Sequence, residues 1–231
     1  MIPQSHIMEW SQQVPWQSNE QVEQDLIICR ALVEIFSDKW LASSLAFRGG
    51  TALHKLYLQP QPRYSEDIDL VQVRAEPIKE TVQRLQVALA FMGESSVKPR
   101  RDGTQIICRF DSEFPPSFRL RLKVEINTRE HFTMHGLVQF PFEVKSSWFD
   151  GGCNLTQKPA LDIEALMLSY KKYMNYSVEK PPTQRDFLLN MEAKIHDSEF
   201  LGDTTALLRP DVPYNPITAY ELVKTTLIAK I

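Results

Sequence analysis

Apolar residues along this chain recur at two different spacings, and each spacing predicts a different element. In residues 18–36 they return every three or four positions, at Val22, Leu26 and Cys29 among others, which predicts an amphipathic helix. Ser18 or Asn19 would cap that helix. The same spacing predicts helices in residues 51–58, 78–93, 161–174 and 183–196, with Gly93 ending the one at 78–93.

Alternation of apolar and polar residues predicts strands in residues 67–73 and 118–127, and the apolar segment at 104–110 is also expected to be a strand. A short apolar run at 45–47 is also strand-like. The alternation is clearest in 118–127, where one face is apolar and the other is charged. The apolar members are Leu120, Leu122, Val124 and Ile126, and the charged members are Arg119, Arg121, Lys123 and Glu125.

These elements predict an α/β (α+β) fold, with a mixed sheet flanked by helices and a mostly helical C-terminal part. We expect an α/β domain over residues 1–155 and a helical domain over 156–231. Residues 1–17 are polar, with two tryptophans and two prolines, and are expected to wrap the surface. The region around Gly151 and Gly152 is expected to be rich in loops.

Composition indicates a soluble protein of the cytoplasm. The chain is 43% hydrophobic and 24% charged, as in ordinary globular proteins. A net charge of −3 argues against a protein that coats nucleic acid, although a local basic patch is compatible with it. Cys29, Cys108 and Cys153 form no CxxC pair, which argues against a disulfide framework or a zinc knuckle. There is no signal-peptide pattern and no apolar run of about 20 residues, so we expect no membrane association.

Two aspartates one residue apart, Asp67 and Asp69, are the first candidate for chemistry. On a strand they project from the same face, about 7 Å apart along it. Carboxylates so placed repel each other unless a cation lies between them, and Mg²⁺ commonly binds one or two carboxylates together with substrate phosphates. Their neighbours Ile68 and Leu70 would face the core. The alternative is a strand with a solvated acidic face.

The segment Gly49-Gly50-Thr51 is the second candidate, because it joins the apolar run at 45–47 to a predicted helix. Glycines allow a close backbone approach, and the free N–H groups at a helix start favour an anion. The alternative is a tight turn with a threonine cap. A phosphate-binding turn followed by a paired-carboxylate strand is a narrower pattern than either motif alone, because a metal-bound triphosphate needs both.

Residues 47–57 (FRGGTALHKLY) and 63–70 (RYSEDIDL) together resemble the AbiEii/AbiGii-type nucleotidyltransferase toxins of bacterial toxin–antitoxin and abortive-infection systems. The resemblance is nearly continuous over 47–70 and patchy, but in order, beyond. It implies transfer of a nucleoside monophosphate from an NTP to an acceptor. Asp67, Asp69 and Glu125, the third carboxylate, would hold Mg²⁺ or Mn²⁺. The residues implied to bind the nucleotide are Gly49, Gly50, Thr51, Arg63, Ser65 and Lys123.

The resemblance also implies a lysine and an aspartate from the helical part. The segment YKKYM leaves Lys171 and Lys172 open, and Lys171 is preferred because it lies away from the predicted apolar stripe. Asp186 is the aspartate of the implied Arg-Asp pair. Leu189 stands where related chains often carry a second aspartate, so a role that needs both carboxylates is not supported.

The acceptor implied by the resemblance is the 3′ end of a tRNA, and a cognate antitoxin is an implied partner. The basic segment at residues 98–101 (KPRR), expected to be a turn, and the charged face of 118–127 are compatible with RNA. A protein hydroxyl is an alternative acceptor. A non-catalytic RNA- or partner-binding protein and a metal-dependent phosphohydrolase are alternative functions. The NTP and the oligomeric state stay open.

Overall fold

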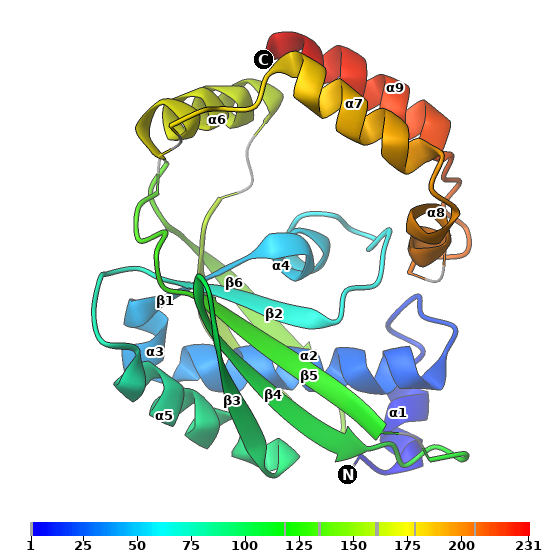
Figure 1. The fold of residues 1–231 in the computed structure, drawn as a ribbon. Helices are drawn as coiled ribbons and strands as arrows, with labels where there is room; N and C mark the ends of the chain where they lie inside the picture. The colour runs from blue at the N-terminus through cyan, green and yellow to red at the C-terminus, as the bar shows by residue number, and fades with distance from the viewer. Residues whose placement is uncertain (1, 118, 134, 160–161, 178, 206) are drawn as a thin grey trace. The chain divides into compact units, whose positions relative to one another are not determined.

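The computed structural model describes residues 2–117, 119–133, 135–159, 162–177, 179–205 and 207–231 (Figure 1). The chain divides into two compact units, Met1–Pro159 and Ala160–Ile231. Phe118 and Leu161, with which we expected a strand and a helix to begin, lie outside the described residues. Within the described residues, no helix combines the length and the apolar character that crossing a membrane requires.

The first unit is built on a mixed seven-stranded sheet with the order β3-β4-β5-β2-β1-β7-β6. Strand β2 runs parallel to β5 and β1 runs parallel to β7, while the other neighbours are antiparallel. The strands are β1 Leu45–Arg48, β2 Asp67–Gln72, β3 Ser95–Arg100, β4 Gly103–Asp111, β5 Arg119–Asn127, β6 Val138–Lys145 and β7 Asp150–Gln157. The predicted mixed α/β fold is thus confirmed.

Helices accompany this sheet in the first unit and make up the second. In the first unit they are α1 Gln4–Trp10, α2 Asn19–Ser37, α3 Lys39–Ser44, α4 Gly49–Leu56, α5 Ile78–Ala88 and the short 3-10 helix Ala90–Met92. In the second they are α6 Ile163–Ser177, α7 Gln184–Ile195, α8 Ser198–Thr205, α9 Pro216–Thr226 and the 3-10 helix Ile228–Lys230.

Helix α2 runs along one side of the sheet (Figure 1), packs against β5, β6 and β7, and is largely buried. The predicted alternation in the central strands is confirmed. Ile68 and Leu70 on β2, like Val124 and Ile126 on β5, are at most 2% exposed. The opposite face of these strands carries the acidic residues, so packing of the apolar face orients them.

Three sequence predictions about elements are wrong. Residues 1–17 contain helix α1, whose Ile7 and Trp10 are buried. Residues 98–100 belong to edge strand β3 rather than to a turn, where Pro99 is tolerated because an edge strand leaves one side unpaired. The glycine-containing region at 150–157 is strand β7. A Cβ added to Gly151 would lie 2.9 Å from the Phe149 ring, so crowding explains the glycine there.

A buried ion pair fixes α4, the helix that opens with the diglycine, to α2. Lys55 Nζ lies 2.8 Å from Asp25 Oδ1, and both side chains are at most 5% exposed. Trp10 donates its indole N–H to the other oxygen of Asp25 at 3.1 Å. Burial alone would lower the pKa of Lys55, but Asp25 and then Cys29 more than offset that effect and raise it. The lysine therefore stays charged and holds α4 in place.

Candidate active site

The diglycine bend, Gly49-Gly50, lies against Asp69, the second of the two aspartates, although 20 positions separate Gly49 from Asp69 in the chain. Arg48, the last residue of β1, is paired with Asp69 on β2, and Gly49 follows it directly. The φ angle of Gly49 is +83°, in the region that favours glycine. A Cβ added to Gly49 would lie 2.1 Å from Asp69 Oδ2. Only glycine therefore allows the bend to approach this carboxylate.

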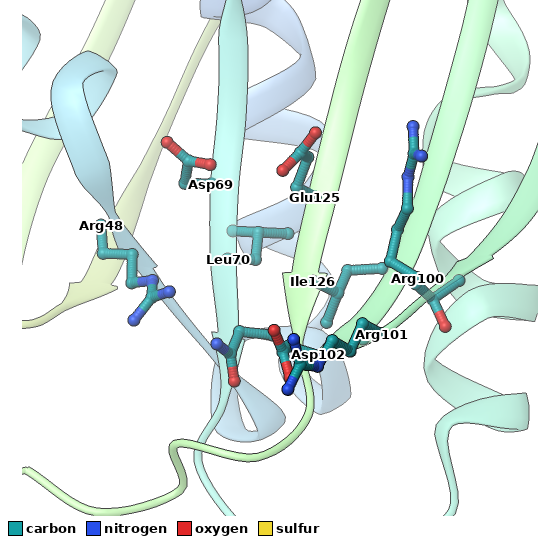
Figure 2. A pocket seen from close by; sticks show the side chains of 11 residues that line it. Arg48, Asp69, Leu70, Arg100, Arg101, Asp102, Glu125 and Ile126 are labelled. Carbon is teal, nitrogen blue, oxygen red and sulfur yellow. The ribbon is translucent and has the colours of Figure 1, made fainter. Parts of the chain in front are cut away.

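Asp69 and Glu125 lie side by side on the same face of the sheet. The parallel register of β2 and β5 pairs them directly, and directly paired residues on neighbouring strands project from the same face. Figure 2 shows both carboxylates on their neighbouring strands. The structure thus brings the predicted third carboxylate next to the second.

Asp67 lies two residues before Asp69 on the same face of β2, and the register between β2 and β5 pairs it with Lys123. Lys123 Nζ lies 2.9 Å from Asp67 Oδ2. We expected Lys123 to contact phosphate. Its ammonium forms an ion pair with an aspartate that we expected to hold a metal.

Burial and nearby negative charge together raise the pKa of Asp69. Burial is the largest cause, followed by the charges of Glu125 and Asp67. Arg48 and Lys123 act in the opposite direction but do not cancel these effects. A carboxylate in this setting is stabilised by a cation, which compensates both for the lost water and for the neighbouring charges.

We expect Glu125→Gln to lower the pKa of Asp69 in the free protein, because it removes the largest charge effect that raises it. Asp69 would then be ionised at lower pH than in the wild type. A ¹³C NMR titration of the Asp69 side-chain carboxyl carbon measures this directly. Asp111→Asn, at an exposed position at the end of β4, is the control. An Asp69 titration curve that does not move in Glu125→Gln would contradict the arrangement of charges.

Thr51 has a different role from the one we predicted for its hydroxyl. Its side chain is 1% exposed, and its hydroxyl donates to the backbone carbonyl of Asp67. The same oxygen lies 2.7 Å from Ser65 Oγ. The hydroxyl therefore ties the bend to the start of β2 and is not a free donor for phosphate. The backbone N–H groups at the start of α4 are of the kind that can bind an anion.

Arg63 is exposed on the loop before β2, next to α4. Burial and then the positive charge of Arg63 lower the pKa of His54, which places the guanidinium near that helix. Among the described residues, the structure shows no ion pair between Arg63 and the carboxylates of the site.

Lys171 and Asp186 belong to the second unit, and the site described above is built from the first unit alone. Lys171 and Lys172 are both exposed on α6, so exposure does not favour either. Asp186 Oδ2 accepts hydrogen bonds from the backbone N–H of Thr183 at 2.8 Å and from its hydroxyl at 2.7 Å. These bonds, the side-chain bond first, lower the pKa of Asp186 and cap helix α7.

A cavity of about 440 Å³ extends from the carboxylates toward the β3–β4 hairpin. Figure 2 shows Asp69 and Glu125 with Arg48, Arg100, Arg101 and Asp102 around it. Its lining residues are Arg48, Asp69, Leu70, Arg100, Arg101, Asp102, Gly103, Thr104, Glu125, Ile126 and Asn127.

Two residues at this cavity were not predicted from the sequence: Arg48, which lines it, and Gln105, which lies next to it. Arg48 pairs with Glu130 and directly precedes the diglycine, a position that could have drawn attention to it. Gln105 donates to Glu125, and a polar residue at the start of the apolar strand at 104–110 was the available signal.

The acidic residues suit an open metal site better than a closed one. In the described part of the chain, no three acidic, histidine or cysteine side chains form a cluster that could enclose a metal ion. Mg²⁺ does not need such a cluster, since one or two carboxylates and the substrate phosphates suffice. Asp67 and Asp69 share one face, and Asp69 is half-buried beside the negative charges of Glu125 and Asp67. These residues therefore fit a metal that arrives with phosphates.

The family model for the nucleotidyl transferase AbiEii toxin of type IV toxin–antitoxin systems matches residues 30–168, more than half of the chain. Among solved structures, MenT4, a nucleotidyltransferase toxin from Mycobacterium tuberculosis, is similar with a TM-score of 0.57 and 15% identity. That match covers 100% of this chain and 91% of MenT4. The likeness shows a shared fold.

Two Helicobacter pylori structures are similar with TM-scores of 0.44. JHP933 is 17% identical and the match covers 80% of this chain and 70% of JHP933. The second, a putative nucleotidyltransferase, is 14% identical, and the match covers 93% of this chain and 82% of that protein. No curated protein sequence matches this chain.

Proposed function

This chain belongs to the nucleotidyl transferase AbiEii toxin family of type IV toxin–antitoxin systems and is a nucleotidyltransferase, and from that premise we propose that it transfers a nucleoside monophosphate from an NTP to the 3′ end of a tRNA with the help of a divalent metal ion. One observation carries the proposal. The carboxylate of Asp69 lies against the diglycine bend on one side and next to Glu125 on the other. A group bound to the bend therefore lies within reach of both carboxylates.

The nucleotide is held by the bend and by the paired aspartates. The backbone N–H groups at the start of α4 receive the β- and γ-phosphates, and the absence of a Cβ at Gly49 and Gly50 lets those phosphates approach. Asp67 and Asp69 would hold Mg²⁺ or Mn²⁺, and the metal would supply positive charge to the triphosphate and the leaving pyrophosphate. Lys123, which pairs with Asp67, would then contact the phosphates.

Glu125 orients the acceptor. The oxygen of the acceptor hydroxyl forms a bond to the α-phosphorus and loses its proton to water, the bond between that phosphorus and the bridging oxygen breaks, and pyrophosphate leaves. Glu125 lines the cavity together with Asp69 and would accept a hydrogen bond from that hydroxyl or complete the metal site. Lys171 and Asp186 are proposed to contact the nucleotide or the acceptor, and comparison of Lys171→Ala with Lys172→Ala separates the two lysines.

Arginines around the cavity support a nucleic acid as the acceptor. Arg48, Arg100 and Arg101 line the cavity that opens from Asp69 and Glu125. Guanidinium groups bind phosphates bidentately, and such contacts position RNA without regard to its sequence. The tRNA 3′ end ends in hydroxyl groups that suit the reaction. Because tRNA and NTPs are cytoplasmic, the proposal places the enzyme there, and the type IV family implies an antitoxin partner.

The proposal is tested by incubating the protein with total RNA, Mg²⁺ and each α-³²P-labelled NTP in turn. We expect label in RNA of tRNA size with at least one NTP, and none after EDTA is added. Label only in free nucleotide products would support a phosphohydrolase instead. Label in protein would show a protein acceptor and contradict the RNA part of the proposal.

A further inference from the structure

Gln105 is a buried polar residue directly beside the third carboxylate. It lies on β4, where the antiparallel register pairs it with Glu125 on β5. Its side chain is on the face that carries Asp69 and Glu125, since these residues are paired in turn across β2, β5 and β4. Gln105 is only 2% exposed. A carboxamide this deeply buried needs partners for both of its ends.

Both ends of the Gln105 amide have a partner. Its Nε2 donates to Glu125 Oε1 at 2.6 Å, and its Oε1 accepts from Arg100 Nη2 at 2.5 Å. A guanidinium only donates hydrogen bonds, so the amide oxygen must face Arg100 and the amide nitrogen must face Glu125. Arg100 thereby sets the orientation of the amide, and the amide sets the orientation of the carboxylate.

We propose that Gln105 is a positioning residue that holds Glu125 in place for metal and acceptor, with Arg100 as its anchor. The inference rests on the proposed function. A neutral donor fixes one carboxylate oxygen without cancelling its charge, unlike Lys123, which forms an ion pair with Asp67. In the described residues, the other oxygen of Glu125 shows no hydrogen bond and is free for a ligand. Hydrogen bonds to groups that bind metals orient them in this way.

The alternative is that the hydrogen bond from Gln105 to Glu125 has a purely structural role. The backbone ladder between β4 and β5 extends over nine residue pairs, from Gly103↔Asn127 to Asp111↔Arg119. It holds the strands together without the Gln105 side chain. The two roles therefore predict different results for a substitution that keeps volume and removes the amide.

The test uses the full chain and measures Mn²⁺ affinity by EPR, with and without a non-hydrolysable NTP. Gln105→Met is expected to weaken Mn²⁺ binding about tenfold in the presence of the nucleotide, as for other residues that orient metal ligands. Ile107→Met is the matched control, because Ile107 lies two residues on, on the same face, and is 7% exposed without a polar side chain. The control is expected to bind Mn²⁺ as the wild type does.

Arg100→Met gives a second variant at an exposed position, in case Gln105→Met does not fold. It frees the amide to rotate and is expected to weaken Mn²⁺ binding in the same direction by a smaller factor. Wild-type Mn²⁺ affinity in the folded Gln105→Met variant, or in Arg100→Met if Gln105→Met does not fold, would overturn the positioning role of Gln105. It would leave the proposed function standing. A wild-type protein that binds no Mn²⁺ with nucleotide would instead overturn the metal-dependent function and the inference with it.

Discussion

Asp69→Asn is expected to lower nucleotide transfer by about a thousandfold or more, because it removes the charge at the centre of the site while keeping the size of the side chain. The side chain lies between the Gly49 bend and Glu125. Initial rates of α-³²P transfer at saturating NTP and RNA measure the loss. Asp102→Asn is the matched control, because Asp102 lines the same cavity but is exposed and pairs with Arg129. We expect the control to retain most activity.

The same variant is expected to be at least as stable as the wild type at pH 7. The pKa of Asp69 is raised in the folded protein. The protonated side chain therefore stabilises the fold below the pKa that Asp69 has in the unfolded chain. This stabilisation is lost as pH rises through the pKa that Asp69 has in the folded protein. Asparagine resembles the protonated form at every pH. The difference in melting temperature should therefore shrink as pH falls toward the ordinary range for aspartate. A variant that is inactive because it is unfolded, or one that is active, would contradict the role of Asp69.

Gly49→Ala is expected to reduce transfer about a hundredfold, because the added methyl group would lie 2.1 Å from Asp69 Oδ2 and displace either the bend or the carboxylate. The positive φ of +83° adds backbone strain of about 1–2 kcal/mol. Transfer rate and melting temperature are both measured, since the collision acts on the site and the strain acts mainly on stability.

Gly93→Ala separates these two effects. Gly93 has a φ of +89°, similar to that of Gly49, but its added Cβ would meet no atom within 4 Å. It should lose stability from backbone strain and keep its activity. Gly50→Ala, with a Cβ at an ordinary 3.6 Å from Ser65 Oγ, is expected to be milder than Gly49→Ala. Equal activity losses in Gly49→Ala and Gly93→Ala would contradict a close approach of the bend to Asp69.

Local patterns were sufficient to predict strands β1, β2, β4 and β5, which include the strands that carry Asp67, Asp69 and Glu125. The alternation around Asp67 and Asp69 predicted that both side chains lie on one face of the strand, and the alternation in 118–127 predicted the face on which Glu125 lies. Alternation within a strand does not determine the register between strands. The pairing of Asp69 with both Arg48 and Glu125 depends on how β1, β2 and β5 are aligned, which is decided by tertiary packing.

The elements that sequence patterns missed are held by distant contacts. Helix α1 is short and is stabilised by its buried Trp10, which donates to Asp25 on α2. Strand β3 lies at the edge of the sheet and lacks an apolar face, so its pattern resembles that of a loop. The capping role of Asp186 was readable, because Thr183 three positions earlier completes the pattern of a capping box.

A crystal structure of the full chain with Mn²⁺ and a non-hydrolysable NTP tests the convergence of the bend and the carboxylates most directly. We predict an anomalous manganese peak at Asp67 and Asp69, with the β- and γ-phosphates at the backbone N–H groups that begin α4 and Lys123 turned from Asp67 toward them. Manganese and triphosphate bound elsewhere, with the ion pair between Lys123 and Asp67 intact, would contradict it.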